Sequence, residues 1–142
     1  MNEKFLYRAK CIDADRWVEG NLLIDTCGCF ICADLCINNR KYKDRHYGYE
    51  IMEIRAFEID PSTICQCTGL KDKNGKLIWE NDIVSGKMYL DHGQWGESVD
   101  DKRIVEWDDD YARFIPCSYM KLDKYEVIGN IFDNPELLEV GE

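Results

Sequence analysis

The chain has 142 residues, the usual size of one domain, and its 45% hydrophobic content is that of a globular protein. Its 28 acidic and 18 basic side chains give a formal net charge of −10, which repels phosphate backbones, so we expect no direct nucleic-acid binding. No apolar run approaches the roughly 18 residues of a membrane span, and no apolar signal segment opens the sequence. We therefore expect a cytoplasmic protein without a membrane partner, whose eight cysteines are reduced.

Two stretches near the start of the chain predict a β-hairpin. Residues 5–12 (FLYRAKCI) alternate in side-chain type from Tyr7 onward, and residues 17–24 (WVEGNLLI) form a second strand-like run. The polar segment 13–16 between them has the composition of a turn. We expect the two strands to pair.

A second hairpin is expected in the middle of the chain. Residues 63–68 (TICQCT) have strand composition, and a return strand begins at residues 77–80 (LIWE). Between them stand Asn74 and Gly75, the strongest short-range hairpin signal, which predicts a type I′ turn with positive φ at both residues. Another strand begins at residues 82–84.

The last third of the chain predicts three more strands. Residues 103–107 (RIVEW) and 112–116 (ARFIP) flank an acidic turn at 108–110, and residues 125–131 (YEVIGNI) form the final strand. Helical character appears only at residues 134–139, where an Asn is placed to cap one short turn and a Pro to occupy its first position. So many short strands with Gly and Asn turns favour a mostly β fold, as a small barrel or sandwich.

Residues 68–84, TGLKDKNGKLIWENDIV, closely resemble the signature of the phage YopX family. Residues 8–10 followed by 17–20 are similar to that family's opening hairpin, and residues 127–138 are similar to its closing segment. The three matches occur in the family's order and are spread over nearly the whole chain.

The resemblance implies a mostly β, YopX-like protein of a phage, prophage or mobile element. It implies a single domain over residues 1–142, with an N-terminal β lobe of about residues 1–62 that carries the hairpin extension. The signature hairpin and a small SH3-like barrel would occupy about residues 63–142. The resemblance brings no established biochemical activity with it.

Turn chemistry accounts for the signature without any ligand. Asn81 stands where the family usually has Gly, and Asn tolerates left-handed backbone nearly as well as any non-glycine residue. Asp82 and Asn130 are suited to hydrogen-bond local backbone in turns. The expected core residues of the signature are Leu77, Ile78, Trp79, Ile83 and Val84.

The cysteines are the sharpest candidate for chemistry. Four of them, Cys27, Cys29, Cys32 and Cys36, fall within ten residues, and four thiolates can hold zinc tetrahedrally. Structural zinc sites, however, draw ligands from two separated knuckles, and cysteine is among the most buried residue types. Thiols that pack in strand cores are therefore the favoured interpretation, and they also suit the remaining cysteines, Cys11, Cys65, Cys67 and Cys117. A redox role is disfavoured because no βαβ pattern surrounds the motif.

No other cluster predicts a catalytic, cofactor-binding or metal-ligating residue. The two histidines, His46 and His92, have no motif partner, and the basic cluster at residues 40–46 is typical of a solvated loop. The segment at residues 72–75 lacks the carboxylates of a calcium loop. Two acidic groups, Asp100 with Asp101 and Asp108 with Asp109 and Asp110, suit solvated turns or a surface for a basic partner.

Three functions are left open by the sequence. The leading hypothesis is a non-enzymatic accessory protein without a cofactor that acts by binding another protein, with a homo-oligomer also allowed by exposed strand edges. An acidic DNA mimic that inhibits a host DNA-binding protein is the first alternative. The second is a zinc-stabilised module, or a metal-dependent enzyme, that uses the Cys27, Cys29, Cys32 and Cys36 cluster.

Overall fold

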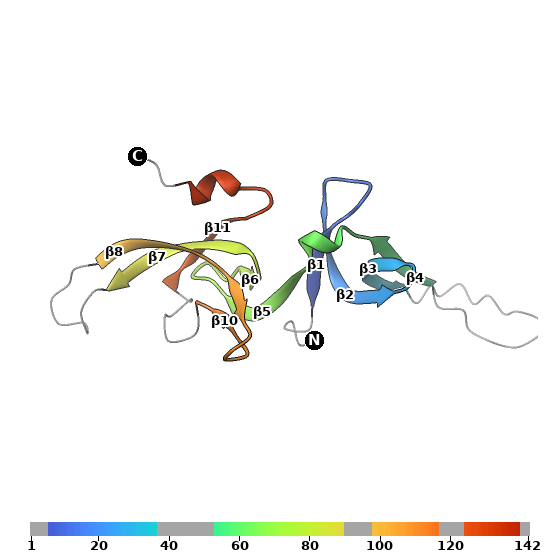
Figure 1. Ribbon diagram of the computed structural model, residues 1–142, viewed down its shortest axis with the longest axis horizontal. Coiled ribbons are helices and arrows are strands. Elements are labelled where there is room, and N and C mark those ends of the chain that lie inside the picture. Colours follow the sequence, from blue (N-terminus) through green and yellow to red (C-terminus); the bar gives the residue numbers. More distant parts are fainter. Residues whose placement is uncertain (1–5, 37–52, 90–97, 117–123, 140–142) are drawn as a thin grey trace, which may run out of the picture. The chain divides into compact units, whose positions relative to one another are not determined.

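The computed structural model describes residues 6–36, 53–89, 98–116 and 124–139 (Figure 1). These residues form β-strands and short 3₁₀ helices, which confirms the mostly β prediction. In the described ranges, no helix is long and apolar enough to cross a membrane. The chain divides into two compact units, one of residues 6–64 and one of residues 65–142 together with the first five.

The unit of residues 6–64 is an antiparallel sheet with strand order β4-β3-β2-β1 (Figure 1). Its elements are β1 (Tyr7–Lys10), β2 (Trp17–Asp25), β3 (Gly28–Cys36), β4 (Glu53–Glu58) and the 3₁₀ helix η2 (Pro61–Thr63). The predicted opening hairpin is confirmed, since β1 pairs with β2 in a register that runs from Tyr7 opposite Gly20 to Lys10 opposite Trp17.

Gly20 allows β3 to lie close to β2. A Cβ at this position would collide with the backbone carbonyl of Cys32 on β3, so no larger residue fits without moving a strand. This close approach gives a packing reason for the glycine of the opening segment, Trp17–Gly20. The core of the unit consists of five buried residues: Ala9, Cys11, Val18, Ile31 and Ile59.

Strands β3 and β4 are absent from the sequence prediction. The run from Cys29 to Ala33 is apolar at successive positions, so it shows no two-residue alternation, and a bulge between Cys32 and Asp34 interrupts the register with β4. Part of the connection between the two strands, the basic cluster at residues 40–46 included, lies outside the described residues.

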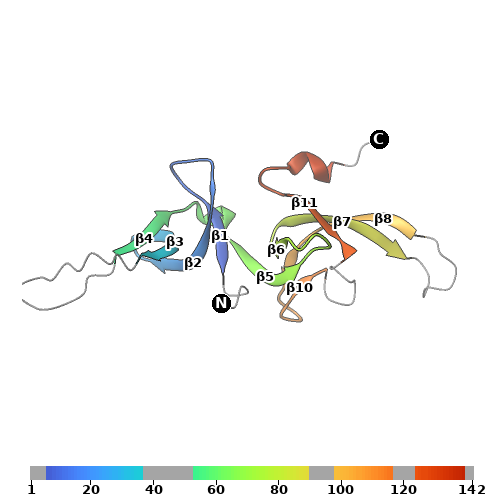
Figure 2. The ribbon, with the colours of Figure 1, turned by 180° about the vertical axis from the view of Figure 1, so that it is seen from behind.

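Within the unit that begins at Cys65, described strands pair antiparallel as β5-β6, β11-β7-β8 and β10-β9, and Figure 2 shows these strands from behind. Its strands are β5 (Cys65–Lys71), β6 (Leu77–Trp79), β7 (Asp82–Tyr89), β8 (Ser98–Ile104), β9 (Glu106–Asp108), β10 (Arg113–Ile115) and β11 (Glu126–Asn130), and the 3₁₀ helix η5 (Pro135–Leu138) follows. The described strands form no closed barrel. The SH3-like closure that the resemblance implies stays a prediction.

The core of this unit is centred on Tyr125, which packs with three buried aliphatic side chains, Ile78, Val84 and Val105. The Tyr125 ring lies against Gly86 of β7, where a Cβ would come within 2.7 Å of the ring. Of the expected core residues, Ile78, Trp79, Ile83 and Val84 are buried and Leu77 is half-buried.

Two local predictions need correction. In η5, Asn134 occupies the N-cap position but makes no side-chain cap bond, because its Oδ1 accepts the backbone N–H of Asn130 instead, at 3.3 Å. Among the described non-glycine residues, only Asn81 and Ala112 have positive φ. Asn74 therefore lacks the positive φ that a type I′ turn requires, and the predicted turn type is wrong.

The signature turn is closed by a single left-handed residue. The N–H of Gly75 donates to the carbonyl oxygen of Asp72 at 3.0 Å, and the N–H of Asp72 donates to the carbonyl of Lys76 at 2.8 Å. Gly75 has a φ of 80°. A turn followed by one left-handed glycine is the three-residue hairpin connection, which needs positive φ at the glycine alone.

We predict that Gly75→Val lowers the free energy of unfolding by about 1–3 kcal/mol, because a β-branched residue at positive φ is strained. A Cβ at this position meets no atom within 4 Å, so the cost comes from the backbone and not from a clash. Gly75→Asn is the matched control and should lose less, since Asn tolerates left-handed backbone. Denaturant unfolding curves of the two variants test this prediction. Equal losses of unfolding free energy in Gly75→Val and Gly75→Asn would show that positive φ is not the constraint.

Candidate functional site

Asp72 of the signature joins its own hairpin to the last strand of the sheet. One oxygen of the buried carboxylate, Oδ1, accepts the backbone N–H groups of Asn74 and Lys76, both at 2.9 Å. The other, Oδ2, accepts the N–H of Val127 on β11 at 3.0 Å. The N–H of Lys73 also donates to the carbonyl of Tyr125 at 2.9 Å. This turn of the signature thus joins two parts of the unit by packing and backbone hydrogen bonds.

The ionised form of Asp72 is the one that this arrangement holds. Burial favours the neutral acid, but the three N–H donors and the nearby Lys76 ammonium outweigh burial, and the pKa of Asp72 lies below its ordinary value of 3.8. The carboxylate therefore stays charged at neutral pH and keeps all of its acceptor capacity.

A second turn, at Asn81 and Asp82, holds the corner between β6 and β7. The buried Asp82 carboxylate accepts the N–H of Trp79 at 2.8 Å, and Asn81 has the left-handed φ of 67° that its place in the signature requires. Asn130 accepts the N–H groups of Phe132 and Asp133 through its side-chain oxygen. The predicted roles of Asp82 and Asn130 in local turns are confirmed.

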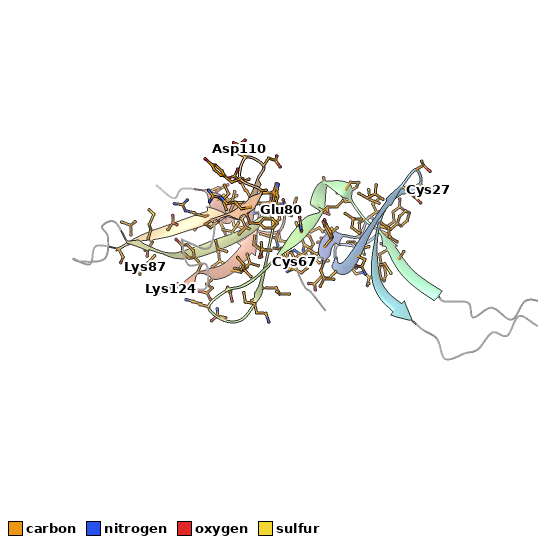
Figure 3. The ribbon with its side chains drawn as sticks, turned by 90° about the horizontal axis from the view of Figure 1, so that it is seen from below. Cys27, Cys67, Glu80, Lys87, Asp110 and Lys124 are labelled. Carbon is orange, nitrogen blue, oxygen red and sulfur yellow. The ribbon has the colours of Figure 1, made fainter. Side chains whose placement is uncertain are left out.

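The cysteine cluster does not fold as a zinc knuckle over its described residues. Cys27 lies exposed in the turn after β2, at the outer end of the β2–β3 hairpin (Figure 3). Cys29 and Cys32 are three residues apart on β3, so they face opposite sides of the sheet. The side chain of Cys36 lies outside the described residues. In the described ranges, no group of three or more His, Cys, Asp or Glu is placed to hold a metal ion.

Four described thiols pack in the interior, as the sequence favoured. Cys11, Cys32, Cys65 and Cys67 are buried among apolar side chains. Cys117 lies outside the described residues, as do both histidines, His46 and His92.

The paired carboxylates of β8 point in different directions. Asp100 is exposed and contacts the ammonium of Lys87 at 3.1 Å. Asp101 turns inward, where it accepts the hydroxyl of Tyr125 at 2.7 Å and the Nε of Arg103 at 2.8 Å. Burial together with the Asp101 carboxylate raises the pKa of Tyr125 to about 12, so its hydroxyl stays protonated and donates. These two carboxylates do not converge on one ligand.

The predicted strand pair around the acidic turn is found as β9–β10, although the predicted strand 103–107 is divided between β8 and β9. The hairpin leaves aromatic rings in solvent. Tyr111 is 71% exposed and Trp107 is 42% exposed. Trp107 packs edge-on against Phe114 with ring centroids 4.9 Å apart, while the guanidinium of Arg113 stacks over the Tyr111 ring at 4.7 Å. Asp110 lies at the outer end of this hairpin (Figure 3). The rings are thus accessible and held by neighbours.

A hollow of about 330 Å³ lies beside the hairpin. Apolar side chains from three elements line it, and η5 is fixed at its edge by the ammonium of Lys102, which donates to the carbonyl of Leu137 at 2.8 Å. The lining residues are Lys102, Arg103, Ile104, Glu106, Ile115, Pro116 and Leu138.

The sequence interpretation identified the acidic turn but missed this hollow. Its residues come from β8, β9, β10 and η5, and no spacing rule links Ile104 to Leu138. Tyr111, a large aromatic directly after three aspartates, is a local signal for the exposed surface of the turn but not for the hollow, which it does not line.

Comparisons with known proteins agree with the sequence resemblance. The family model described as YopX protein matches residues 6–139. Among solved structures, the chain is similar to protein EF1440 from Enterococcus faecalis, at 29% sequence identity and a TM-score of 0.60, with 94% of this chain and 96% of that chain covered. No curated protein matches the chain.

We predict that Asp72→Asn lowers the free energy of unfolding by about 2–3 kcal/mol at neutral pH, because its amide group would face backbone donors that need an acceptor. The folded-state pKa of Asp72 is depressed, so the stability it contributes is present above its ordinary pKa of 3.8 and is lost as pH falls through the folded value. The difference in melting temperature between wild type and variant should therefore shrink below about pH 4.

Asp109→Asn serves as the control, since this aspartate is exposed in the β9–β10 turn. It should melt like the wild type across the same pH series. A difference between wild type and Asp72→Asn that stays constant from neutral to acid pH would contradict the role given to the ionised carboxylate.

Proposed function

Because the chain belongs to the YopX family, we propose that it is a non-enzymatic accessory protein of a phage, prophage or mobile element that acts by binding another protein. Family membership supports the biological setting, as the resemblance implies it. The binding role is supported by the surface of the β9–β10 hairpin.

The exposure of Tyr111 and Trp107 is the observation that carries the proposal. Tyrosine and tryptophan dominate the energetic centres of protein interfaces, because each brings a large contact area with few rotatable bonds. In this hairpin the stack of Arg113 on Tyr111 and the contact of Phe114 with Trp107 already restrict both rings. Restrained rings lose little entropy on binding, which favours association.

The use of the polar side chains supports a role without catalysis. Asp72, Asp82 and Asn130 hold backbone groups in turns, and Asp101 is taken up by Tyr125 and Arg103. The inward-facing carboxylates among the described residues thus hold the fold together through hydrogen bonds and an ion pair. Because the carboxylates of Asp72, Asp82 and Asp101 face inward, they are not available to imitate the phosphates of DNA.

The proposal is tested by retrieval of partners with the affinity-tagged chain from a lysate of the cell that expresses it. We predict that a partner bound by wild type is reduced about tenfold by Tyr111→Ala. Ile24→Ala is the matched control, because Ile24 is a large apolar side chain, 66% exposed, in the other unit. It should retain the partner.

Two outcomes would contradict this assignment. A partner held equally by wild type and Tyr111→Ala would place the interface elsewhere. A partner released by competing DNA would favour the acidic DNA-mimic function instead, because mimic and DNA share one binding surface.

A further inference from the structure

Three charged side chains line the hollow beside β9–β10, and they differ in their partners. The ammonium of Lys102 faces the carbonyl of Leu137, and the guanidinium of Arg103 is paired with Asp101 at 2.8 Å. Glu106, by contrast, is exposed at the edge of the hollow and forms no ion pair with a described residue. The carbonyl of Leu137 is neutral, so Lys102 keeps its positive charge and balances Glu106 at this edge.

The excess of negative charge lies in the turn of the β9–β10 hairpin. Asp108 is paired with Arg113 at 3.6 Å, whereas the side chains of Asp109 and Asp110 form no ion pair with any described residue. In the same turn, Arg113 already lies between the Tyr111 ring and a carboxylate. An aromatic ring and a carboxylate of this hairpin thus already bind one guanidinium group, that of Arg113.

Four of the seven described lining residues of the hollow are apolar. Ile104, Ile115 and Pro116 come from β8 and the end of β10, and Leu138 of η5 is 39% exposed at the other side. A volume of about 330 Å³ is at the lower end of the roughly 300–1,000 Å³ typical of ligand pockets, which suits one large apolar side chain of a partner better than a cofactor.

We propose that this hollow, formed by β8, β9, β10 and η5, binds an extended segment of a partner protein in which an apolar anchor residue is flanked by Lys or Arg. The anchor enters between Ile104, Ile115 and Leu138, and the basic neighbours pair with Glu106 and with the acidic turn. This inference rests on the proposed function and specifies the chemistry of the partner. Charge complementarity decides the occupant, because Asp109 and Asp110 of the neighbouring turn add two negative charges that favour basic over acidic neighbours of the anchor.

The test selects ligands for the immobilised full-length chain from a display library of random dodecapeptides. The expected result is enrichment of peptides with an apolar residue beside Lys or Arg. The best peptide, made synthetically, should shift the backbone amide resonances of Ile104, Glu106 and Ile115 and leave that of Val18 in the other unit unchanged.

Two variants locate the binding. Glu106→Lys should weaken the selected peptide about tenfold through like-charge repulsion, and Leu138→Asp should do so by making one wall polar. Asp13→Lys is the charge-matched control, since Asp13 is an exposed loop residue of the other unit, and it should change the affinity less than about twofold.

Enrichment of acidic peptides, failure to enrich any motif, or binding that survives Glu106→Lys and Leu138→Asp would overturn the inference. These failures are separable from failure of the proposed function. If a protein partner depends on Tyr111 while the library gives no basic motif, the binding role stands and the assignment of the hollow falls.

Discussion

The carboxylate of Asp72 is the constraint on which the C-terminal unit depends. Its two oxygens satisfy three backbone N–H groups, two from the turn that follows it and one from β11, which is far away in sequence. Backbone donors are present whatever the side chain, so the whole requirement falls on a single acidic residue. This carboxylate is the buried link between the hairpin and the last strand. Exposed contacts of Lys73 and Asn74 with Glu126 add to it, and the core around Tyr125 is assembled beside them.

The signature segment serves the fold, whereas the β9–β10 hairpin carries the exposed side chains. Of the polar residues of the signature, Asp72 and Asp82 are directed at backbone groups and the Asn81 amide donates to the Cys65 thiol, while the apolar residues fill the core. The surface that we propose for partners lies outside the signature. The β9–β10 hairpin meets this condition, because Tyr111 and the carboxylates after Trp107 project from a two-stranded sheet. Its sequence can vary without disturbing the bonds that define the fold.

The sequence predicted those parts of the fold in which the signal is local. The β1–β2 and β9–β10 pairs follow from alternating side chains around polar turns, and the roles of Asp82 and Asn130 follow from residues two or three positions away. Strand β3 was missed because apolar side chains occupy both of its faces. The turn type was wrong because the Asn-Gly pair signals a tight reversal, while the Asp72 side chain selects a connection with one left-handed residue. The hollow unites four elements, which no local rule can assemble.

The close contact between Gly86 and the ring of Tyr125 has a consequence for how such sequences change over generations. Any side chain at position 86 needs the volume that the ring occupies, and loss of the ring leaves a void over the glycine. A single substitution at either position therefore passes through a poorly packed intermediate. The two positions should behave as one inherited unit, replaced together or not at all, and a library that varies them independently would sample mostly unfolded chains.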